Sequence, residues 1–154
     1  MILTVDIGNT TIGLCGLERR EPGNYRVVAS VKLDTVPGAC AVGCRRELEA
    51  ALARAGIHPE ALEGVAVSSV VPSLNRPVGE SLRALLGRDA VWITAGSRTG
   101  LTLDVPEPGR VGLDRLVDAA WAAAHCPLPA VTVDMGTATT FNVVDKGGVF
   151  RGGI

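Results

Sequence analysis

Two short segments of the chain carry nearly the same polar pattern directly after an apolar run. The first reads LTVDIGNTT and the second VTVDMGTAT, so that Asp6 corresponds to Asp134 and Gly8 to Gly136. Glycine at such a turn lets the backbone approach an anion, neighbouring hydroxyl and amide groups donate hydrogen bonds, and an aspartate can hold a cation or order water. Two such turns facing one another would hold the phosphates of a nucleotide and its metal ion.

Each of these turns is expected to connect two strands, residues 2–5 with 11–17 in the first copy and residues around 131–134 with 139–144 in the second. A single glycine turn of this type is also common in sheets that bind nothing. The repetition favours the phosphate-binding interpretation, because internal duplication is a strong indication of architecture.

The remaining pattern predicts an α/β fold. An apolar run at 25–33 would complete a three-stranded antiparallel meander, and strands then alternate with helices, which implies parallel crossovers. The expected elements are a helix at 41–55, a strand at 64–69, a helix at 72–86 and a strand at 90–94.

The segment 99–111 is rich in turn-forming residues and is the expected linker. An alanine-rich helix at 114–125 follows, and then the second hairpin. We therefore expect one domain at 1–110 and the beginning of a second, incomplete one at 111–154. The expected apolar stripe of the last helix consists of Leu116, Val117, Ala120, Trp121 and Ala124, and both Trp92 and Trp121 are expected in the core.

Composition narrows the functional classes. The 154 residues include 15 basic and 16 acidic side chains, so there is no positive excess to attract nucleic acid or an anionic membrane. The N-terminus lacks the pattern of a secretion signal, which predicts a soluble, cytoplasmic protein. The cysteines are scattered, and we expect neither a metal site nor a disulfide among them: Cys15, Cys40, Cys44 and Cys126.

Four motifs occur in a characteristic order: DIGNT from Asp6, SSVVP from Ser68, GLDR from Gly112 and DMGTATT from Asp134. Together they resemble the type III pantothenate kinases, members of the acetate and sugar kinase/Hsp70/actin superfamily. The resemblance implies two ribonuclease-H-like (actin-like ATPase) domains with ATP between them and homodimerisation through the second. It also implies phosphorylation of pantothenate, the first step of coenzyme A biosynthesis.

The resemblance also assigns roles to residues. Asp6 would manage Mg²⁺ and its water, Thr137 would contact ATP, and Asp134 would serve the monovalent cation, K⁺ or NH₄⁺. Asp114 would accept the proton of the substrate hydroxyl. The implied phosphate loop comprises Asp6, Ile7, Gly8, Asn9, Thr10, Thr11, Ile12 and Gly13, and the implied pantothenate site comprises Gly112, Leu113, Asp114 and Arg115.

These residue types suit phosphoryl transfer, in which the protein mainly positions groups and neutralises charge. The Arg115 guanidinium offers a planar fork for the carboxylate or amide of the substrate, or for the transferring phosphate. Asp114 has a second interpretation, as a helix N-terminal residue favoured by the helix dipole, and the two roles are compatible.

The sequence departs from the family pattern in three respects. Val105 lies where some relatives place an aromatic residue before the linker proline, so a substrate contact is expected to be missing. Asn142 stands where many relatives carry aspartate, which removes a negative charge near the cation side. Members of the family also continue well beyond Gly153, so the chain is expected to be truncated in the second domain. A non-catalytic truncated relative, or a transcriptional-activator-like regulator of the same fold, is therefore the alternative to a kinase; the carboxylates of Asp6, Asp114 and Asp134 favour the kinase.

Overall fold

The computed structural model describes residues 1–21 and 23–154. By packing, the chain divides into two compact units, Met1–Trp92 and Ile93–Ile154. Residues 93–110 therefore pack with the second unit, whereas the sequence placed them before the domain boundary. The predicted boundary between residues 110 and 111 stays a prediction of domain organisation.

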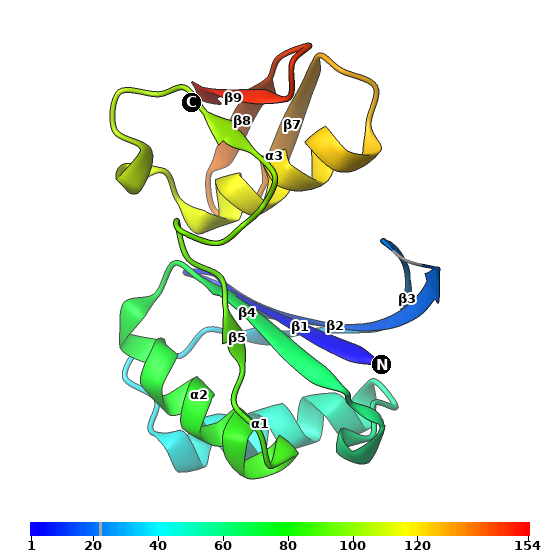
Figure 1. Ribbon diagram of the computed structural model, residues 1–154. Helices are drawn as coiled ribbons and strands as arrows, with labels where there is room; N and C mark the ends of the chain where they lie inside the picture. Colours follow the sequence, from blue (N-terminus) through cyan, green and yellow to red (C-terminus); the bar gives the residue numbers. More distant parts are fainter. Residues whose placement is uncertain (22) are drawn as a thin grey trace. The chain divides into compact units, whose positions relative to one another are not determined.

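The first unit is built on a five-stranded sheet with the order β3-β2-β1-β4-β5 (Figure 1). Strands β1, β2 and β3 form the predicted antiparallel meander, and β4 and β5 extend it in parallel from the other edge of β1. The strands are β1 (Ile2–Ile7), β2 (Thr11–Glu21), β3 (Asn24–Asp34), β4 (Gly64–Ser69) and β5 (Val91–Trp92).

Two helices cover one face of this sheet, α1 (Ala41–Arg54) and α2 (Pro72–Leu86), with a short 3₁₀ turn, η1 (Pro59–Ala61), between them in the chain. Alternation along β1 sends its buried side chains to that face and leaves Asp6 exposed on the other. Helix α2 begins with proline at its first position and ends at Gly87, which has φ +65°. The buried β1 residues are Leu3, Val5 and Ile7.

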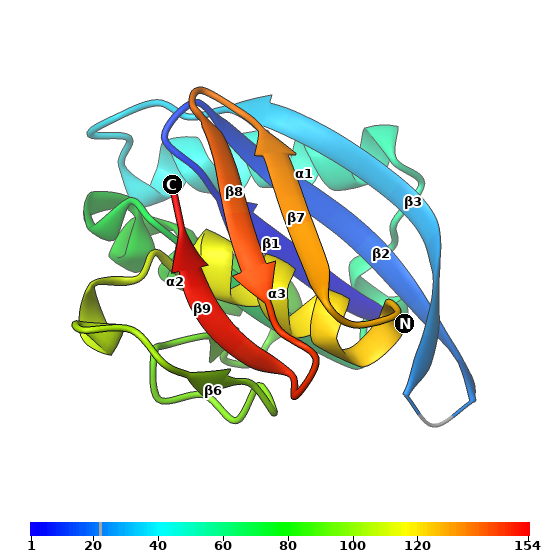
Figure 2. The same cartoon turned by 90° about the horizontal axis from the view of Figure 1, so that it is seen from above.

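The second unit has a four-stranded sheet with the order β6-β9-β8-β7, of which β7, β8 and β9 are seen side by side in Figure 2. Strands β7 and β8 form the predicted second hairpin, and β6 comes from the segment predicted as a linker. The elements are β6 (Thr102–Leu103), η2 (Pro108–Arg110), α3 (Leu113–His125), β7 (Ala130–Met135), β8 (Thr139–Val144) and β9 (Val149–Gly153).

Helix α3 packs through a different stripe from the predicted one. Its buried residues are Leu116, Ala119 and Ala122, whereas Trp121 is 61% exposed and its ring lies 5.2 Å from that of His125. The prediction that Trp121 belongs to the core was wrong, because in an alanine-rich helix the neighbouring phase packs equally well. Trp92 does pack against the core of the first unit.

Within the described residues, no helix combines the length and apolar character needed to cross a membrane.

Candidate active site

The first predicted phosphate loop connects β1 to β2 and is held by hydrogen bonds from both sides. The Gly8 amide donates to the Thr11 carbonyl at 2.9 Å, which closes the turn. Thr35, directly after β3, holds it from the neighbouring strand: its hydroxyl donates to the Gly8 carbonyl at 2.7 Å and its amide to the Thr10 carbonyl at 2.8 Å. These contacts fix the backbone of the loop before any ligand arrives.

Asp6 has space beside it because its cross-strand neighbour is Gly13. A β-carbon built at Gly13 would come no closer to another residue than 4.0 Å, at the Asp6 β-carbon. On the other side, Asp6 is in register with Ser68 of β4, whose buried Oγ makes no hydrogen bond to any other described residue. A carboxylate, an orphaned hydroxyl and a side-chain-free neighbour are suited to a hydrated cation.

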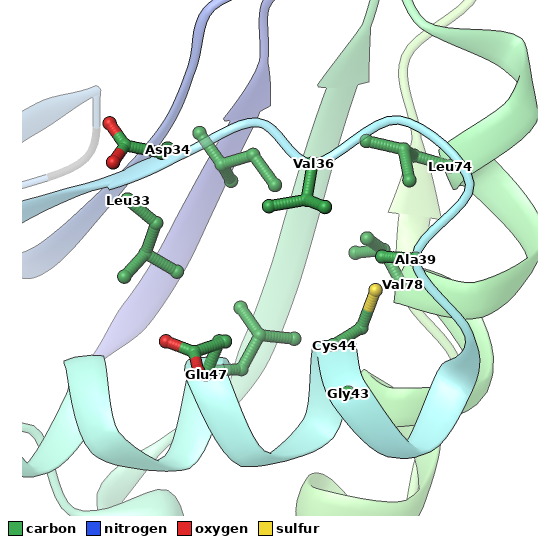
Figure 3. Close-up of a pocket in the computed structure, with 11 residues that line it drawn as sticks. Leu33, Asp34, Val36, Ala39, Gly43, Cys44, Glu47, Leu74 and Val78 are labelled. Atoms are coloured by element: carbon green, nitrogen blue, oxygen red, sulfur yellow. The ribbon is translucent and has the colours of Figure 1, made fainter.

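Two of the predicted loop residues have their side chains in the core. Ile7 and Ile12 pair across the hairpin and are buried, so they can approach a nucleotide only through their backbone. Ile12 also lines a small pocket of about 50 Å³ between β3, α1 and α2 (Figure 3). Its lining is almost entirely apolar, with Asp34 and Glu47 as the charged members, so this pocket is unsuited to phosphates.

The second predicted loop connects β7 to β8. Between the last paired residues of its two strands it is one residue shorter than the first loop. Met135 pairs with Thr139 across residues 136–138, whereas Ile7 pairs with Ile12 across residues 8–11. The Gly136 amide donates to the Ala138 carbonyl at 3.2 Å. The two sequence repeats are thus both hairpin turns after a strand-end aspartate, but their registers differ.

Asp134 lies at the end of β7 and lines an open groove of about 390 Å³ between that strand and α3. Asp118 and Trp121 of α3 line the same groove. Sequence reasoning did not select Asp118; its position one turn after Asp114 on the helix was the available signal.

The GLDR segment forms the N-terminus of α3, with Gly112 as the N-cap. Asp114 turns back so that its Oδ1 accepts the Arg115 amide at 2.8 Å. A β-carbon at Gly112 would collide with this oxygen, so glycine is what leaves room for the carboxylate. Asp114 thus lies in the first turn of α3, the position that its second interpretation expects.

Arg115 extends from α3 to β8, where its Nε donates to Asn142 Oδ1 at 2.6 Å and its Nη2 to the Phe141 carbonyl at 3.4 Å. Asn142 is fully buried and in turn donates to Thr132 Oγ1 at 3.1 Å. The sequence indicated a place near the cation for Asn142 but not these contacts. A polar residue at an inward-facing strand position was the signal that could have revealed them.

A family model described as type III pantothenate kinase matches residues 2–154. The chain belongs to this family. Type III pantothenate kinases of Dehalococcoides mccartyi and Agathobacter rectalis are 36% and 32% identical to it, over 152 and 154 residues. These alignments cover 99% and 100% of this chain but 57% of each relative, so the chain spans a little over half the length of these kinases.

Solved structures share the fold at low sequence identity. The activator of the 2-hydroxyisocaproyl-CoA dehydratase from Clostridium difficile, with bound ADPNP, is 18% identical with a TM-score of 0.54, covering 99% of this chain and 44% of that one. The Aquifex aeolicus Ppx/GppA phosphatase is 12% identical with the same TM-score of 0.54, covering 99% and 50%. The α/β actin-like fold expected from the sequence is confirmed.

Kinases of this family use ATP, which implies a divalent metal ion. Among the described residues, no group of three histidine, cysteine or acidic side chains is placed to hold a metal ion alone. Mg²⁺ in phosphotransferases is commonly bound by one or two carboxylates together with phosphates of the substrate. The surroundings of Asp6, with Gly13 and the Ser68 hydroxyl beside it, fit that arrangement.

Proposed function

We propose that this chain carries binding and catalytic elements of an ATP-dependent kinase that phosphorylates pantothenate to 4'-phosphopantothenate, the first step of coenzyme A biosynthesis. The observation that carries the proposal is the family match over residues 2–154, which includes both glycine turns and the GLDR helix start. Exposed Asp6 and the helix-terminal Asp114 then have the chemistry that the reaction needs.

In this proposal the first loop binds ATP phosphates. Gly8 allows close approach, and Asn9 and Thr10 are exposed at the tip, where they can donate to phosphate oxygens. Asp6 holds the metal ion through water or directly, and bound Mg²⁺ supplies neutralisation of phosphate charge. Because Thr35 fixes the loop, little conformational entropy is lost when the phosphates bind.

Asp114 is the proposed general base. Its Oδ1 is occupied by the Arg115 amide, and its Oδ2 makes no hydrogen bond within the second unit. One oxygen therefore fixes the carboxylate while the other can orient the terminal hydroxyl of pantothenate and take its proton late in the transfer. Gly112 and Leu113 provide the backbone of this site, and Arg115 binds an anionic group.

The second loop is the proposed site of further nucleotide and cation contacts. Thr137 contacts ATP, and Asp134, which lines the groove beside α3, serves K⁺ or NH₄⁺. By family membership we also propose a homodimer located in the cytoplasm, acting on a small molecule and binding neither nucleic acid nor membrane.

The test is K⁺-dependent transfer of the ATP γ-phosphate to pantothenate, assayed with this chain and with any longer product of the same reading frame. Asp114→Asn is the test variant, and Asp89→Asn, which alters an exposed aspartate of the first unit, is the matched control. We expect turnover that Asp114→Asn abolishes and Asp89→Asn preserves. Absence of phosphate transfer by folded protein of both lengths would contradict the proposal and favour a non-catalytic relative.

A further inference from the structure

Asn142 has the lowest exposed fraction of the polar residues in the second unit. It is 0% exposed and lies on β8 two residues before Val144, which is in the hydrophobic core with Ala119 and Phe150. Burying an amide is favourable only when its donors and acceptors are bonded. Its oxygen accepts from Arg115 and its nitrogen donates to Thr132, so this amide is committed to one arginine.

The hydrogen bonds to the Arg115 guanidinium involve only its Nε and Nη2 atoms. An arginine has five N–H groups, of which Nε–H is used by Asn142 and one Nη2–H by the Phe141 carbonyl. The other three make no hydrogen bond within the second unit. The ion pairs described in the second unit involve Arg110 and Arg151, not Arg115. Within the second unit, its positive charge therefore forms no ion pair with a carboxylate.

Strand β9 restricts the guanidinium further. A β-carbon at residue 153 would lie 2.6 Å from Arg115 Nη2 and would overlap the Phe141 carbonyl oxygen. Only glycine fits between β8 and this arginine. The guanidinium is thus confined by Asn142, the Phe141 carbonyl and the Gly153 backbone, which removes much of the rotamer freedom of a long side chain.

We propose that Asn142, with Thr132 behind it, is a positioning residue that aims Arg115 at an anionic oxygen of the substrate without neutralising its charge. A carboxylate in the same place would hold the arginine equally well but would compensate its charge and weaken its attraction for an anion. The neutral amide of Asn142 holds the guanidinium in place and leaves its positive charge uncompensated. This inference rests on the proposed function, in which Arg115 belongs to the pantothenate site.

The ligand chemistry is an oxyanion, either the carboxylate of pantothenate or the transferring phosphate. Two titrations distinguish these sources: binding of pantothenate alone, and binding of ATP alone. A loss of affinity confined to pantothenate assigns Arg115 to the carboxylate, and a loss confined to ATP assigns it to phosphate. Equal affinity of the wild type and the variants for both ligands would overturn the proposal.

Two variants of Asn142 separate geometry from charge. Asn142→Ala removes the acceptor, whereas Asn142→Asp keeps it and adds a negative charge. We expect both to weaken binding of the oxyanion by about tenfold to a hundredfold, the range of one hydrogen bond to a charged group. Thr132→Val, which removes only the bond behind the amide, should have a smaller effect.

The position of the guanidinium is read independently of activity, from solvent exchange of the Arg115 Nε–H in the nuclear magnetic resonance spectrum. Slow exchange is expected in the wild type and in Asn142→Asp, and fast exchange in Asn142→Ala. Retained protection of backbone amides in β7 and β8 shows that each variant is folded. Slow exchange of Nε–H in folded Asn142→Ala would also overturn the proposal.

This readout keeps the inference apart from the proposed function. If the wild type binds an oxyanion through Arg115 but transfers no phosphate, the kinase assignment fails and the positioning role stands. If phosphate transfer is observed and both Asn142→Ala and Asn142→Asp bind the oxyanion as tightly as the wild type, the positioning role fails alone.

Discussion

Val5 and Val133 hold the same position in the two repeated strands, but Val5 is 1% exposed and Val133 is 51% exposed. In the first unit, the face that contains Val5 is covered by α1 and α2. In the second unit, α3 covers the face of the sheet opposite to Val133, which is the face that carries Thr132 and Asn142. The same strand pattern therefore leaves an apolar face exposed in the second unit, composed of Val131, Val133, Met135, Phe141 and Val143.

This apolar face, with β7 at the edge of its sheet, should make the 154-residue chain self-associate. Val133→Thr keeps a β-branched side chain but removes apolar surface, and it should lower the sedimentation coefficient at high protein concentration towards that of a monomer. Val42→Thr, at an exposed position of α1, is the control and should change nothing. Concentration-independent sedimentation of the wild type as a monomer would exclude this behaviour.

Gly153 is expected to be intolerant of a side chain. A β-carbon there overlaps the Phe141 carbonyl, to which the adjacent Ile154 amide donates at 3.1 Å. Gly153→Ala should lower the free energy of unfolding by about 1–3 kcal/mol, as for overpacking in an interior. Gly109→Ala, where a β-carbon meets open space, should have little effect in the same urea titration. Equal stability of the two variants would show that β9 shifts without cost.

Much of the fold could be predicted because its signals are local. Apolar alternation predicted the strands of the meander, and Pro72 indicated the start of α2. The two-residue strand β6 could not be predicted, because its pairing with β9 depends on contacts distant in sequence. The phase of α3 was ambiguous because alanine fits any face.

In the candidate site, too, residues within short motifs could be predicted, whereas contacts between distant parts of the sequence could not. The motifs identified Asp6 and Asp114 by type and spacing, and these assignments stay predictions. The partner of Arg115 was not predictable, because Asn142 lies 27 residues away and meets it only after the sheet has formed.

Thr35 should control ATP affinity although it lies outside the predicted loop. Its hydroxyl holds the Gly8 carbonyl, so Thr35→Val leaves the loop one hydrogen bond short. We expect ATP to bind about twofold to tenfold more weakly, the range of one neutral hydrogen bond. Thr35→Ser keeps the hydroxyl and should restore binding, measured by calorimetric titration. If Thr35→Val bound ATP as tightly as the wild type, the loop would need no such support.

Asp145 should make the stability of the second unit depend on pH. Its pKa is lowered, first by the Val149 amide, which donates to Oδ1 at 3.0 Å, and then by Arg151, whose Nε donates to Oδ2 at 2.8 Å. A carboxyl group whose folded pKa lies below its unfolded value, about 3.9 for aspartate, stabilises the protein above that value. This contribution is lost as the pH falls through the folded pKa.

Asp145→Asn should therefore lower the Tm at neutral pH, and the difference from the wild type should shrink in acid, once the wild-type carboxyl is protonated as well. The measurement is a series of thermal unfolding curves from neutral to acidic pH. Asp89→Asn, which alters an exposed aspartate near Arg83, serves as the control for loss of one surface charge. A Tm difference that stays constant across the series would contradict the prediction. It would mean that the effect of Asp145 on stability does not depend on the ionisation of its carboxyl group.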